Sequence, residues 1–391
     1  SPAPALASQP GDPSDAGTAP DVTRPLVLAT GSHHEQAYWV AGGRSDELRL
    51  FPFVWLIADK RWVPRRDAFL QPPDAPPHAI RWNSNCIACH AVGGRPGHDP
   101  DRDAFNTRAV ELGISCEACH GPGGAHARRH RDPVERYLAH SAHDTPDRPG
   151  GDPTIINPAR LPPDRSAAVC GQCHSYAYPR DEDDWWSNGY AVSFRPGQDL
   201  SPSRSLLTPV ALARDGAPRV EAASESLFWD DGVIRVGGRE YNALVDSPCY
   251  ARGKGEHQMT CLSCHSMHAG DPDDQLAPDR RNDQACLSCH SDKQTSDHTH
   301  HALPDAPGIA SSAGSSCVNC HMPYTTYGLL KTIRSHTVSS PSVRESVDAR
   351  RPNACNLFIS IAARLDRRRA RAEGLLAEAL AFRKAMEDSL I

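Results

Sequence analysis

Six pairs of cysteines in this chain share one spacing, and a histidine follows each pair directly. The six motifs, numbered 1 to 6 in chain order, are Cys86–Cys89–His90, Cys116–Cys119–His120, Cys170–Cys173–His174, Cys261–Cys264–His265, Cys286–Cys289–His290 and Cys317–Cys320–His321. The two thiols of such a motif form thioether bonds to the vinyl groups of a haem, and the adjacent imidazole reaches the iron from one face. A shuffled chain with 14 cysteines and 20 histidines among 391 residues would contain roughly 0.03 such motifs. The motifs therefore predict six covalently bound haem c groups.

Two other chemistries use paired cysteines. A zinc ribbon needs two Cys-x-x-Cys pairs, and those of motifs 4 and 5 are 21 residues apart, near the usual spacing. Zinc, however, gives no reason for a histidine directly after every pair. A thioredoxin-like redox site fails on the same ground, and one domain does not need six of them. Haem attachment is the better interpretation for every motif.

Each iron needs a second ligand on its other face. Fourteen histidines lie outside the motifs: His33, His34, His78, His98, His126, His130, His140, His143, His257, His268, His298, His300, His301 and His336. A single histidine is usually an ordinary surface or core residue, but so many in one haem chain raise the odds of ligation. The four methionines are too few for six irons. We expect mostly bis-histidine irons, which favour electron transfer over catalysis because no coordination position is open to substrate.

The composition agrees with a chain whose interior is filled by something other than aliphatic side chains. Hydrophobic residues make up 39%, while proline (35) and glycine (28) are abundant. The net charge of −6 does not indicate a nucleic-acid binder. The longest strong apolar run, Phe51 to Ala58, is too short to span a membrane.

Export follows from the chemistry, because haem attachment of this kind happens outside the cytoplasm. No basic stretch and hydrophobic segment follow Ser1, so the chain reads as a mature form without its export signal. We therefore expect a periplasmic, extracellular or cell-surface protein.

The pattern along the chain predicts three parts. Residues 1–25 form a Pro/Ala-rich tail, 26–352 a hexahaem cytochrome domain and 353–391 a C-terminal helical segment. Aromatic and β-branched residues predict short strands or a hairpin from Gln36 to Leu70, and a second β-like stretch from Ser226 to Ala243. The expected fold class is mainly irregular and α-helical, organised around the haems, with small β-hairpin elements and a C-terminal helix.

The amino-acid sequence around the motifs resembles a known family. The runs SNCIACH, ISCEACHGPGGAH, AVCGQCHS, MTCLSCHSMH, QACLSCH and SSCVNCHMP are similar to the multihaem cytochrome superfamily that includes the nitrifier tetrahaem cytochrome and the doubled-CxxCH proteins. The stretches GSHHEQAYW, RPGQDL and GREYNAL also look like that family, so the resemblance runs from about Gly31 to Ser360.

The resemblance implies which histidines are distal ligands. They are His126 after CHGPGG, His268 in CHSMH, His298 and His301 in HTHH, His336 in RSHT, and one of His33 and His34, with His34 favoured. The reserves are His257, His130 and His140.

Two departures from the family pattern bear on function. Where relatives often carry a further motif, this chain has Cys355 but Phe358 and Ile359 in place of a second cysteine and a histidine, so no haem can attach. Cys355 is then an odd thiol like Cys249, and a disulfide between the two is one option in an exported protein. The CxxCK motif that holds the catalytic iron of haem nitrite reductases is absent.

Three functions are compatible with these features. The favoured hypothesis is an electron carrier that serves redox partner proteins and is not an enzyme. The first alternative is a subunit of a polymeric extracellular cytochrome filament, in which the partners are further copies of the chain. The second is a multihaem oxidoreductase with one open haem acting on a small nitrogen or sulfur compound.

Overall fold

The computed structural model describes residues 23–68, 80–141, 151–208, 227–268, 275–301 and 313–353. Four interpretations of the sequence lie wholly or largely outside these ranges: the Pro/Ala-rich tail, the C-terminal helical segment, the lost motif at Cys355, and its disulfide with Cys249. His78 and His143 also lie outside them.

The N-terminal part is a four-stranded antiparallel sheet in which consecutive strands are neighbours. Its strands are β1 (Leu26–Thr30), β2 (Glu35–Ala41), β3 (Leu48–Leu56) and β4 (Arg61–Pro64). The alternation of buried and half-buried residues along β2, with Ala37 and Trp39 inward, matches a sheet with one packed face. The strands predicted between Gln36 and Leu70 are confirmed, and β1 extends the sheet before them.

Four further sheets have two strands each within the described ranges. They pair β5 (Ala91–Val92) with β8 (Glu111–Leu112), β6 (His98–Asp99) with β7 (Ala104–Phe105), β9 (Ala177–Pro179) with β10 (Arg204–Leu206), and β11 (Tyr324–Gly328) with β12 (Lys331–Arg334). The second predicted β-like stretch is only partly right. Phe228 and Ile234 bridge across a turn, but the chain from Glu240 forms a helix, because Tyr241, Ala243 and Leu244 are buried together on it.

The helices are short and are joined by irregular chain. The α-helices are α1 (Ile87–His90), α2 (Cys116–His120), α3 (Gly124–Arg129), α4 (Pro133–Ser141), α5 (Pro163–His174), α6 (Glu182–Asn188), α9 (Glu240–Asp246), α10 (Pro248–Ala251), α11 (Gln284–Leu287), α12 (Ser296–Thr299), α13 (Cys317–His321) and α14 (Val343–Asp348). A π-turn, η2 (Trp82–Cys86), leads into α1, and the remaining turns are 3₁₀.

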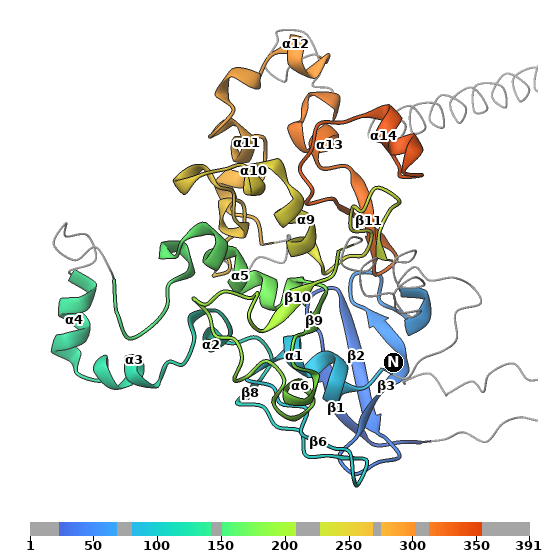
Figure 1. The fold of residues 1–391 in the computed structure, drawn as a ribbon, viewed down its shortest axis with the longest axis vertical. Coiled ribbons are helices and arrows are strands. Elements are labelled where there is room, and N and C mark those ends of the chain that lie inside the picture. The colour runs from blue at the N-terminus through green and yellow to red at the C-terminus, as the bar shows by residue number, and fades with distance from the viewer. Residues whose placement is uncertain are drawn as a thin grey trace, which may run out of the picture.

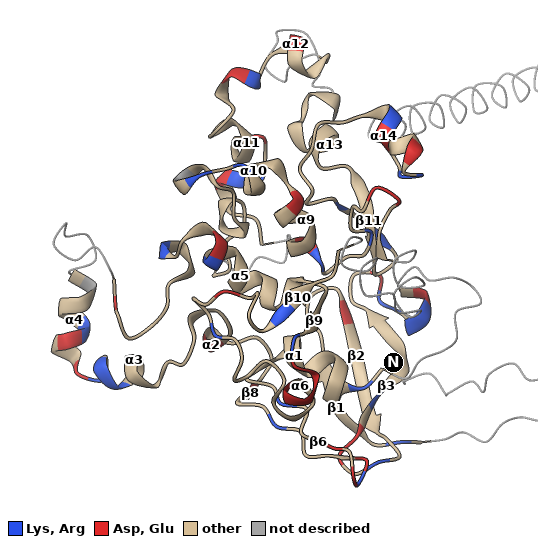
Figure 2. Ribbon diagram, in the orientation of Figure 1, with Lys and Arg blue, Asp and Glu red and all other residues tan. Residues whose placement is uncertain are grey.

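The 3₁₀ turns mostly separate the α-helices. They are η1 (Arg65–Ala68), η3 (Pro158–Arg160), η4 (Gly255–His257), η5 (Cys261–Ser263), η6 (Pro278–Arg280), η7 (Ser291–Lys293) and η8 (Ala313–Ser315). Figure 1 shows the sheet at one end, α11 to α14 at the other, and α3 and α4 extending sideways from the body. Basic and acidic residues are interspersed along the described part of the ribbon (Figure 2).

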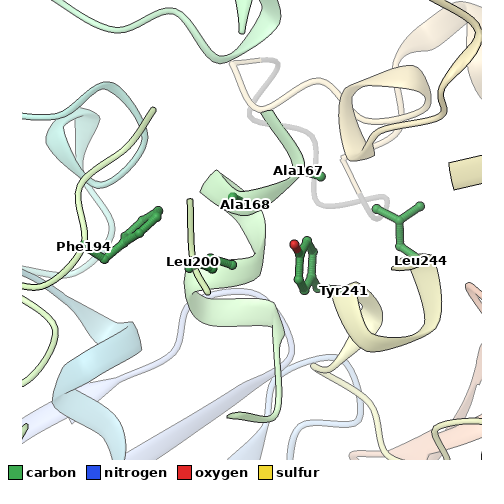
Figure 3. Close-up of a cluster of buried hydrophobic side chains, with 6 residues drawn as sticks. All are labelled: Ala167, Ala168, Phe194, Leu200, Tyr241 and Leu244. Atoms are coloured by element: carbon green, nitrogen blue, oxygen red, sulfur yellow. The ribbon is translucent and has the colours of Figure 1, made fainter. Parts of the chain in front are cut away.

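The apolar core is divided into small clusters. One lies between α5 and α9 and contains Ala167, Ala168, Phe194, Leu200, Tyr241 and Leu244 (Figure 3). Another joins the sheet to the chain of motif 1 through Trp39, Trp82, Ile87 and Ala91. Such small clusters agree with the expectation that side chains alone do not fill the interior. Among the described residues, no helix has the length and apolar character that crossing a membrane requires.

Candidate haem-binding sites

Each motif occupies a short helix or turn. Motifs 1, 2, 3 and 6 end α1, α2, α5 and α13, and each of these helices stops at the motif histidine. Motifs 4 and 5 lie at η5 and α11. In motifs 2, 3 and 6 both cysteines lie within one helix, where residues three apart share a face, so both thiols are turned to one side. That arrangement suits attachment to two points on one edge of a haem.

Three motif histidines each lie opposite a histidine from elsewhere in the chain. The ring centroids of His120 and His268 are 5.8 Å apart with planes inclined by 18°. Those of His265 and His336 are 6.3 Å apart, also at 18°. The rings of His321 and His298 are separated by 6.0 Å and inclined by 5°.

This spacing is the one that two imidazoles sharing a metal ion adopt. With metal–nitrogen bonds of about 2 Å on each side, the ring centroids of two trans imidazoles lie roughly 6 Å apart. Motifs 2, 4 and 6 thus have a donor set that fits a six-coordinate haem iron. The structure brings together three of the histidines implied by the family resemblance, His268, His298 and His336, with three motif histidines.

Backbone carbonyls orient several of these rings. The Nδ1 atom of His120 lies 2.6 Å from the carbonyl oxygen of Ile156, and that of His321 lies 2.9 Å from the oxygen of Ser339. The Nδ1 atom of His336 is 3.1 Å from the carbonyl oxygen of Arg334. Because a carbonyl oxygen only accepts, each Nδ1 carries the proton and Nε2 keeps a lone pair for a metal.

Motif 3 differs, because its histidine donates to a carboxylate. Nδ1 of His174 lies 2.8 Å from Oε2 of Glu240. Burial by itself would raise the pKa of Glu240, but the hydrogen bond and the charge of His174 bring that pKa down to about 2. The pKa of His174 is raised, chiefly by the same hydrogen bond.

The other histidines implied by the resemblance lie apart from the three pairs. His33 and His34 are exposed between β1 and β2, and the Ser32 hydroxyl lies 2.8 Å from Nδ1 of His33. His301 lies directly over Gly314, just before motif 6. For His90, His174 and His290, no second histidine of the described ranges lies at the 6 Å spacing.

His126 on α3 points at a carboxylate. Its Nδ1 atom lies 3.0 Å from Oδ2 of Asp152, and Nε2 of the reserve candidate His130 hydrogen-bonds the same oxygen. Arg129 and Thr154 contact the other carboxylate oxygen. Asp152 is therefore saturated with donors, and its pKa is lowered by these hydrogen bonds in spite of burial. Of the other reserves, His257 ends η4 and His140 lies in α4.

The motifs also contact one another through their cysteines. The sulfur of Cys89 lies 3.9 Å from the carbonyl oxygen of Cys173, and the sulfur of Cys173 lies 3.8 Å from the carbonyl oxygen of Cys89. The side chains of Cys170 and Cys261 contact each other, and so do those of Cys286 and Cys317. Motif 1 therefore touches motif 3, motif 3 touches motif 4, and motif 5 touches motif 6.

Glu240 and Asp152 hydrogen-bond candidate ligand histidines, and the sequence did not reveal either contact. Glu240 is 66 positions from His174, and Asp152 is 26 positions from His126. A single acidic residue so distant from its partner has no spacing that would mark it. GREYNAL resembles a family segment, but nothing in that resemblance points to the carboxylate.

Two family models match segments of the chain that contain CxxCH motifs. Residues 69–121 match the family described as cytochrome c554 and c-prime, and residues 254–295 match the doubled CXXCH motif. No curated protein matches the chain. One solved structure, the outer cell wall cytochrome OcwA, is similar in fold, with a TM-score of 0.50 and 19% identity over 83% of this chain and 69% of that one.

The chain is a multihaem c-type cytochrome that binds haem covalently through its CxxCH motifs. Its fold, short helices with small sheets, is that of a multihaem cytochrome.

Proposed function

We propose that this chain is an exported electron-transfer protein that carries six haem c groups with bis-histidine irons. The observation that carries the proposal is the set of three imidazole pairs at 5.8 to 6.3 Å. When bound, the haem supplies the one-electron couple. The paired histidines would hold the iron from both faces, which would leave no coordination position open to a substrate.

The distal ligands of the other three motifs rest on the family resemblance. For motifs 1, 3 and 5, the described ranges contain no second histidine ring at the 6 Å spacing. The resemblance implies three further distal ligands: His126, His301 and one of His33 and His34. We propose that these histidines are the distal ligands of motifs 1, 3 and 5, without assigning each to its motif.

The contacts between cysteines support a route for electrons. A thioether sulfur is bonded to the edge of its haem, so sulfurs in contact bring two haem edges close together. Direct contacts link motifs 1, 3 and 4 in series and link motifs 5 and 6. Cys264 interacts electrostatically with Cys286, and Cys119 with Cys170, and we infer from this a 4–5 step and a neighbourhood of motifs 2 and 3.

The resulting order is 1–3–4–5–6, with motif 2 as a branch at motif 3. One pair of histidines supports the 5–6 step, because His298, which lies opposite the motif 6 histidine, lies eight positions after His290 of motif 5. His268, which lies opposite the motif 2 histidine, lies three positions after His265 of motif 4, so motif 2 is near motif 4 as well as motif 3.

We place the protein outside the cytoplasm, in the periplasm or at the cell surface, with redox proteins as its partners. Covalent haem attachment supports this location, and the similar fold of a cell wall cytochrome is in line with it.

The test uses the matured holoprotein. Its intact mass should exceed that of the polypeptide by six haems, and the ferric paramagnetic resonance spectrum should contain low-spin signals alone. A fast-reacting high-spin iron that binds cyanide or nitric oxide would instead support the oxidoreductase alternative. A mass increment below six haems would contradict the haem count.

A further inference from the structure

The histidines of the motifs differ in what their Nδ1 atoms face. His120 and His321 donate to neutral backbone carbonyls. His174 donates to the carboxylate of Glu240, at 2.8 Å. At motif 3, therefore, the Nδ1 proton faces an acidic side chain, whereas at motifs 2 and 6 it faces a carbonyl oxygen.

A carboxylate acceptor changes the ligand more than a carbonyl does. It draws the Nδ1 proton toward itself, which gives the imidazole partial anionic character and makes Nε2 a stronger donor to iron. A stronger, more negative ligand stabilises the ferric state over the ferrous state. Hydrogen bonding beyond the axial ligands is one of the means by which a protein sets a haem potential.

We propose that Glu240 is a positioning residue that holds the haem of motif 3 at a lower reduction potential than its neighbours. The inference rests on the proposed electron-transfer function and deepens it. Glu240 lies 66 positions from His174, the histidine of the motif that it would influence.

The surroundings hold the carboxylate in place. Glu240 begins α9, and its Oε1 atom accepts a hydrogen bond of 2.8 Å from the backbone nitrogen of Gly238. The next residue, Tyr241, packs against α5, the helix that ends in motif 3 (Figure 3). The donor helix and the acceptor helix therefore form one packed unit, and the hydrogen bond has a fixed geometry.

Two charged or ionisable neighbours also face this carboxylate region. His336, the partner of the motif 4 histidine, interacts electrostatically with Glu240. Arg239 lies near His90 and His174 and opposes the carboxylate there. Glu240 thus stands between the ligands of motifs 3 and 4, and its strongest contact is with motif 3.

The consequence concerns electron flow. Motif 3 is the junction where motifs 1, 2 and 4 meet. An electron on a low-potential junction haem passes on to a neighbour instead of staying there. Electrons would then reside mainly on the haems at the two ends of the proposed order. Reduction of the junction haem would be an energetically uphill step between them.

The experiment compares Glu240→Gln with the unaltered holoprotein by spectroelectrochemical titration. Gln keeps the size of the side chain and removes its charge. We expect one haem to become easier to reduce, with its ferrous-to-ferric ratio at a given potential rising at least tenfold, which is about 59 mV for one electron. Its ferric low-spin resonance should also move, because the ligand field weakens.

The control is Asp246→Asn, which removes an exposed carboxylate from the other end of the same helix. It should leave every haem potential unchanged. Glu240→Asp keeps the charge on a shorter side chain and should shift the same haem by less than Glu240→Gln does.

The outcomes separate this inference from the proposed function. If Glu240→Gln holds six low-spin haems with unchanged potentials, the inference is wrong and electron transfer stands. A shift spread evenly over all the haems also overturns it. If the unaltered protein itself lacks bis-histidine spectra, the proposed function fails. Should the Gln variant not mature, an unshifted potential in Glu240→Asp together with a shift in Asp246→Asn would contradict the inference.

Discussion

At the scale of single residues, hydrogen bonds donated by Nδ1 to backbone carbonyls orient imidazoles of this cytochrome. Ile156, Ser339 and Arg334 each offer a backbone carbonyl to one ring of a histidine pair. A fixed ring costs less conformational entropy when it binds a metal than one that must be ordered first. The three pairs are thus prepared for ligation by the polypeptide itself.

The HTHH run provides a sharp test of axial ligation. His298 faces His321. The exposed neighbour His300 directly follows α12 with a φ of 58°, and within the described ranges its ring is not paired with a motif histidine. His298→Ala should open one coordination position and convert one haem to a high-spin, cyanide-binding form. His300→Asn, a residue that tolerates positive φ, should keep the low-spin spectrum. Visible and paramagnetic resonance spectra of both ferric proteins measure this, and equal spectra would refute the assignment of His298.

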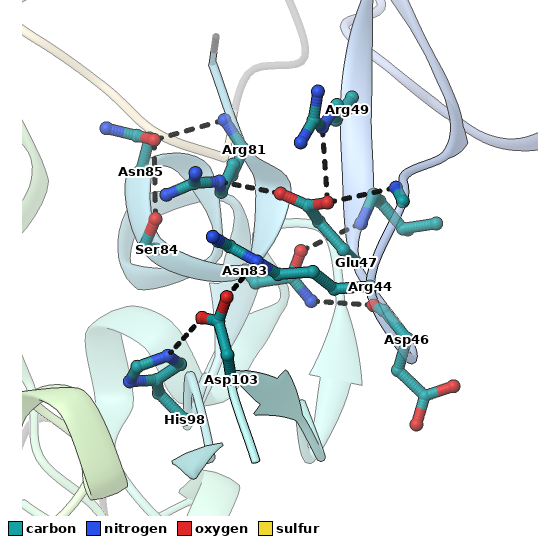
Figure 4. Close-up of polar contacts among 12 residues, drawn as sticks. Arg44, Asp46, Glu47, Arg49, Arg81, Asn83, Ser84, Asn85, His98 and Asp103 are labelled. Carbon is teal, nitrogen blue, oxygen red and sulfur yellow. Dashed lines mark hydrogen bonds and ion pairs between the residues drawn. The ribbon is translucent and has the colours of Figure 1, made fainter. Parts of the chain in front are cut away.

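At the scale of elements, a buried carboxylate joins the sheet to motif 1. The fully buried side chain of Glu47 accepts hydrogen bonds from Arg49 at 3.1 Å and from Arg81 at 2.7 Å (Figure 4). Asn83, in the turn η2 that leads into motif 1, accepts from the backbone nitrogen of Leu48 and donates to the carbonyl oxygen of Asp46. These bonds fix motif 1 to the β2–β3 turn.

The ionisation of Glu47 should therefore contribute to stability in a pH-dependent way. Burial alone would raise its pKa, but the two arginines outweigh burial and hold the pKa below the ordinary 4.5. Since the folded state binds the proton more weakly than the unfolded state, this contribution is complete above about pH 5 and lost as the pH falls through the lowered value.

Glu47→Gln should lower the free energy of unfolding by about 1–3 kcal/mol at neutral pH. The difference from the unaltered protein should shrink as the pH falls below the ordinary value. Urea titrations at several pH values measure it. Glu111→Gln, at an exposed site in β8, serves as the control and should show little effect. A difference that grows in acid would contradict the assigned sign.

Glycine within motif 3 tests the packing of α5 against α9. A Cβ at Gly171 would lie 2.8 Å from side-chain atoms of both Leu200 and Tyr241. Gly171→Ala should thus destabilise the holoprotein by about 1–3 kcal/mol through overpacking. At Gly124 in α3 the nearest atom is a flexible arginine tip at 3.6 Å, so Gly124→Ala should be neutral or slightly stabilising. Thermal melts of the two variants compare them directly, and equal melting temperatures would argue against the tight α5–α9 contact.

At the scale of the whole molecule, the proposed order of the haems is a branched line. The sheet carries motif 1 at one end, and motif 6 lies on α13 near α14 at the other (Figure 1). Motifs 4 and 5 join these regions, whereas motif 2 lies to the side of the line. The loss of one haem should therefore have consequences that depend on its place.

Voltammetry can test the proposed order of the haems. The protein would be coupled to an electrode through Val343→Cys, an exposed site on α14, in a Cys249→Ser and Cys355→Ser background. Replacing both cysteines of motif 4 with alanine should leave only the haems of motifs 5 and 6 in rapid exchange with the electrode. Removing motif 2 in the same way should leave its five remaining haems in rapid exchange. The integrated charge at fast scan rates measures both numbers, and equal charges in the two variants would contradict the proposed order.

Much of the chemistry follows from short-range pattern. CxxCH places thiols and imidazole within one helical turn, so haem attachment is readable without any fold. The strands from Gln36 onward also follow from their local content of aromatic and β-branched residues. The prediction of β structure from Ser226 to Ala243 is only partly right, because the burial of Tyr241 and Leu244 against α5, a tertiary contact, favours a helix at its end.

What the tertiary structure alone decided is the meeting of distant residues. Nothing in the spacing couples His120 with His268, or His174 with Glu240, because the chain between them is too long and irregular to fix a distance. The family resemblance named the distal histidines, but their partners depend on how the helices pack. The sequence by itself therefore determined which atoms can hold haem, and the fold decided which of them face each other and which carry a charge beside them.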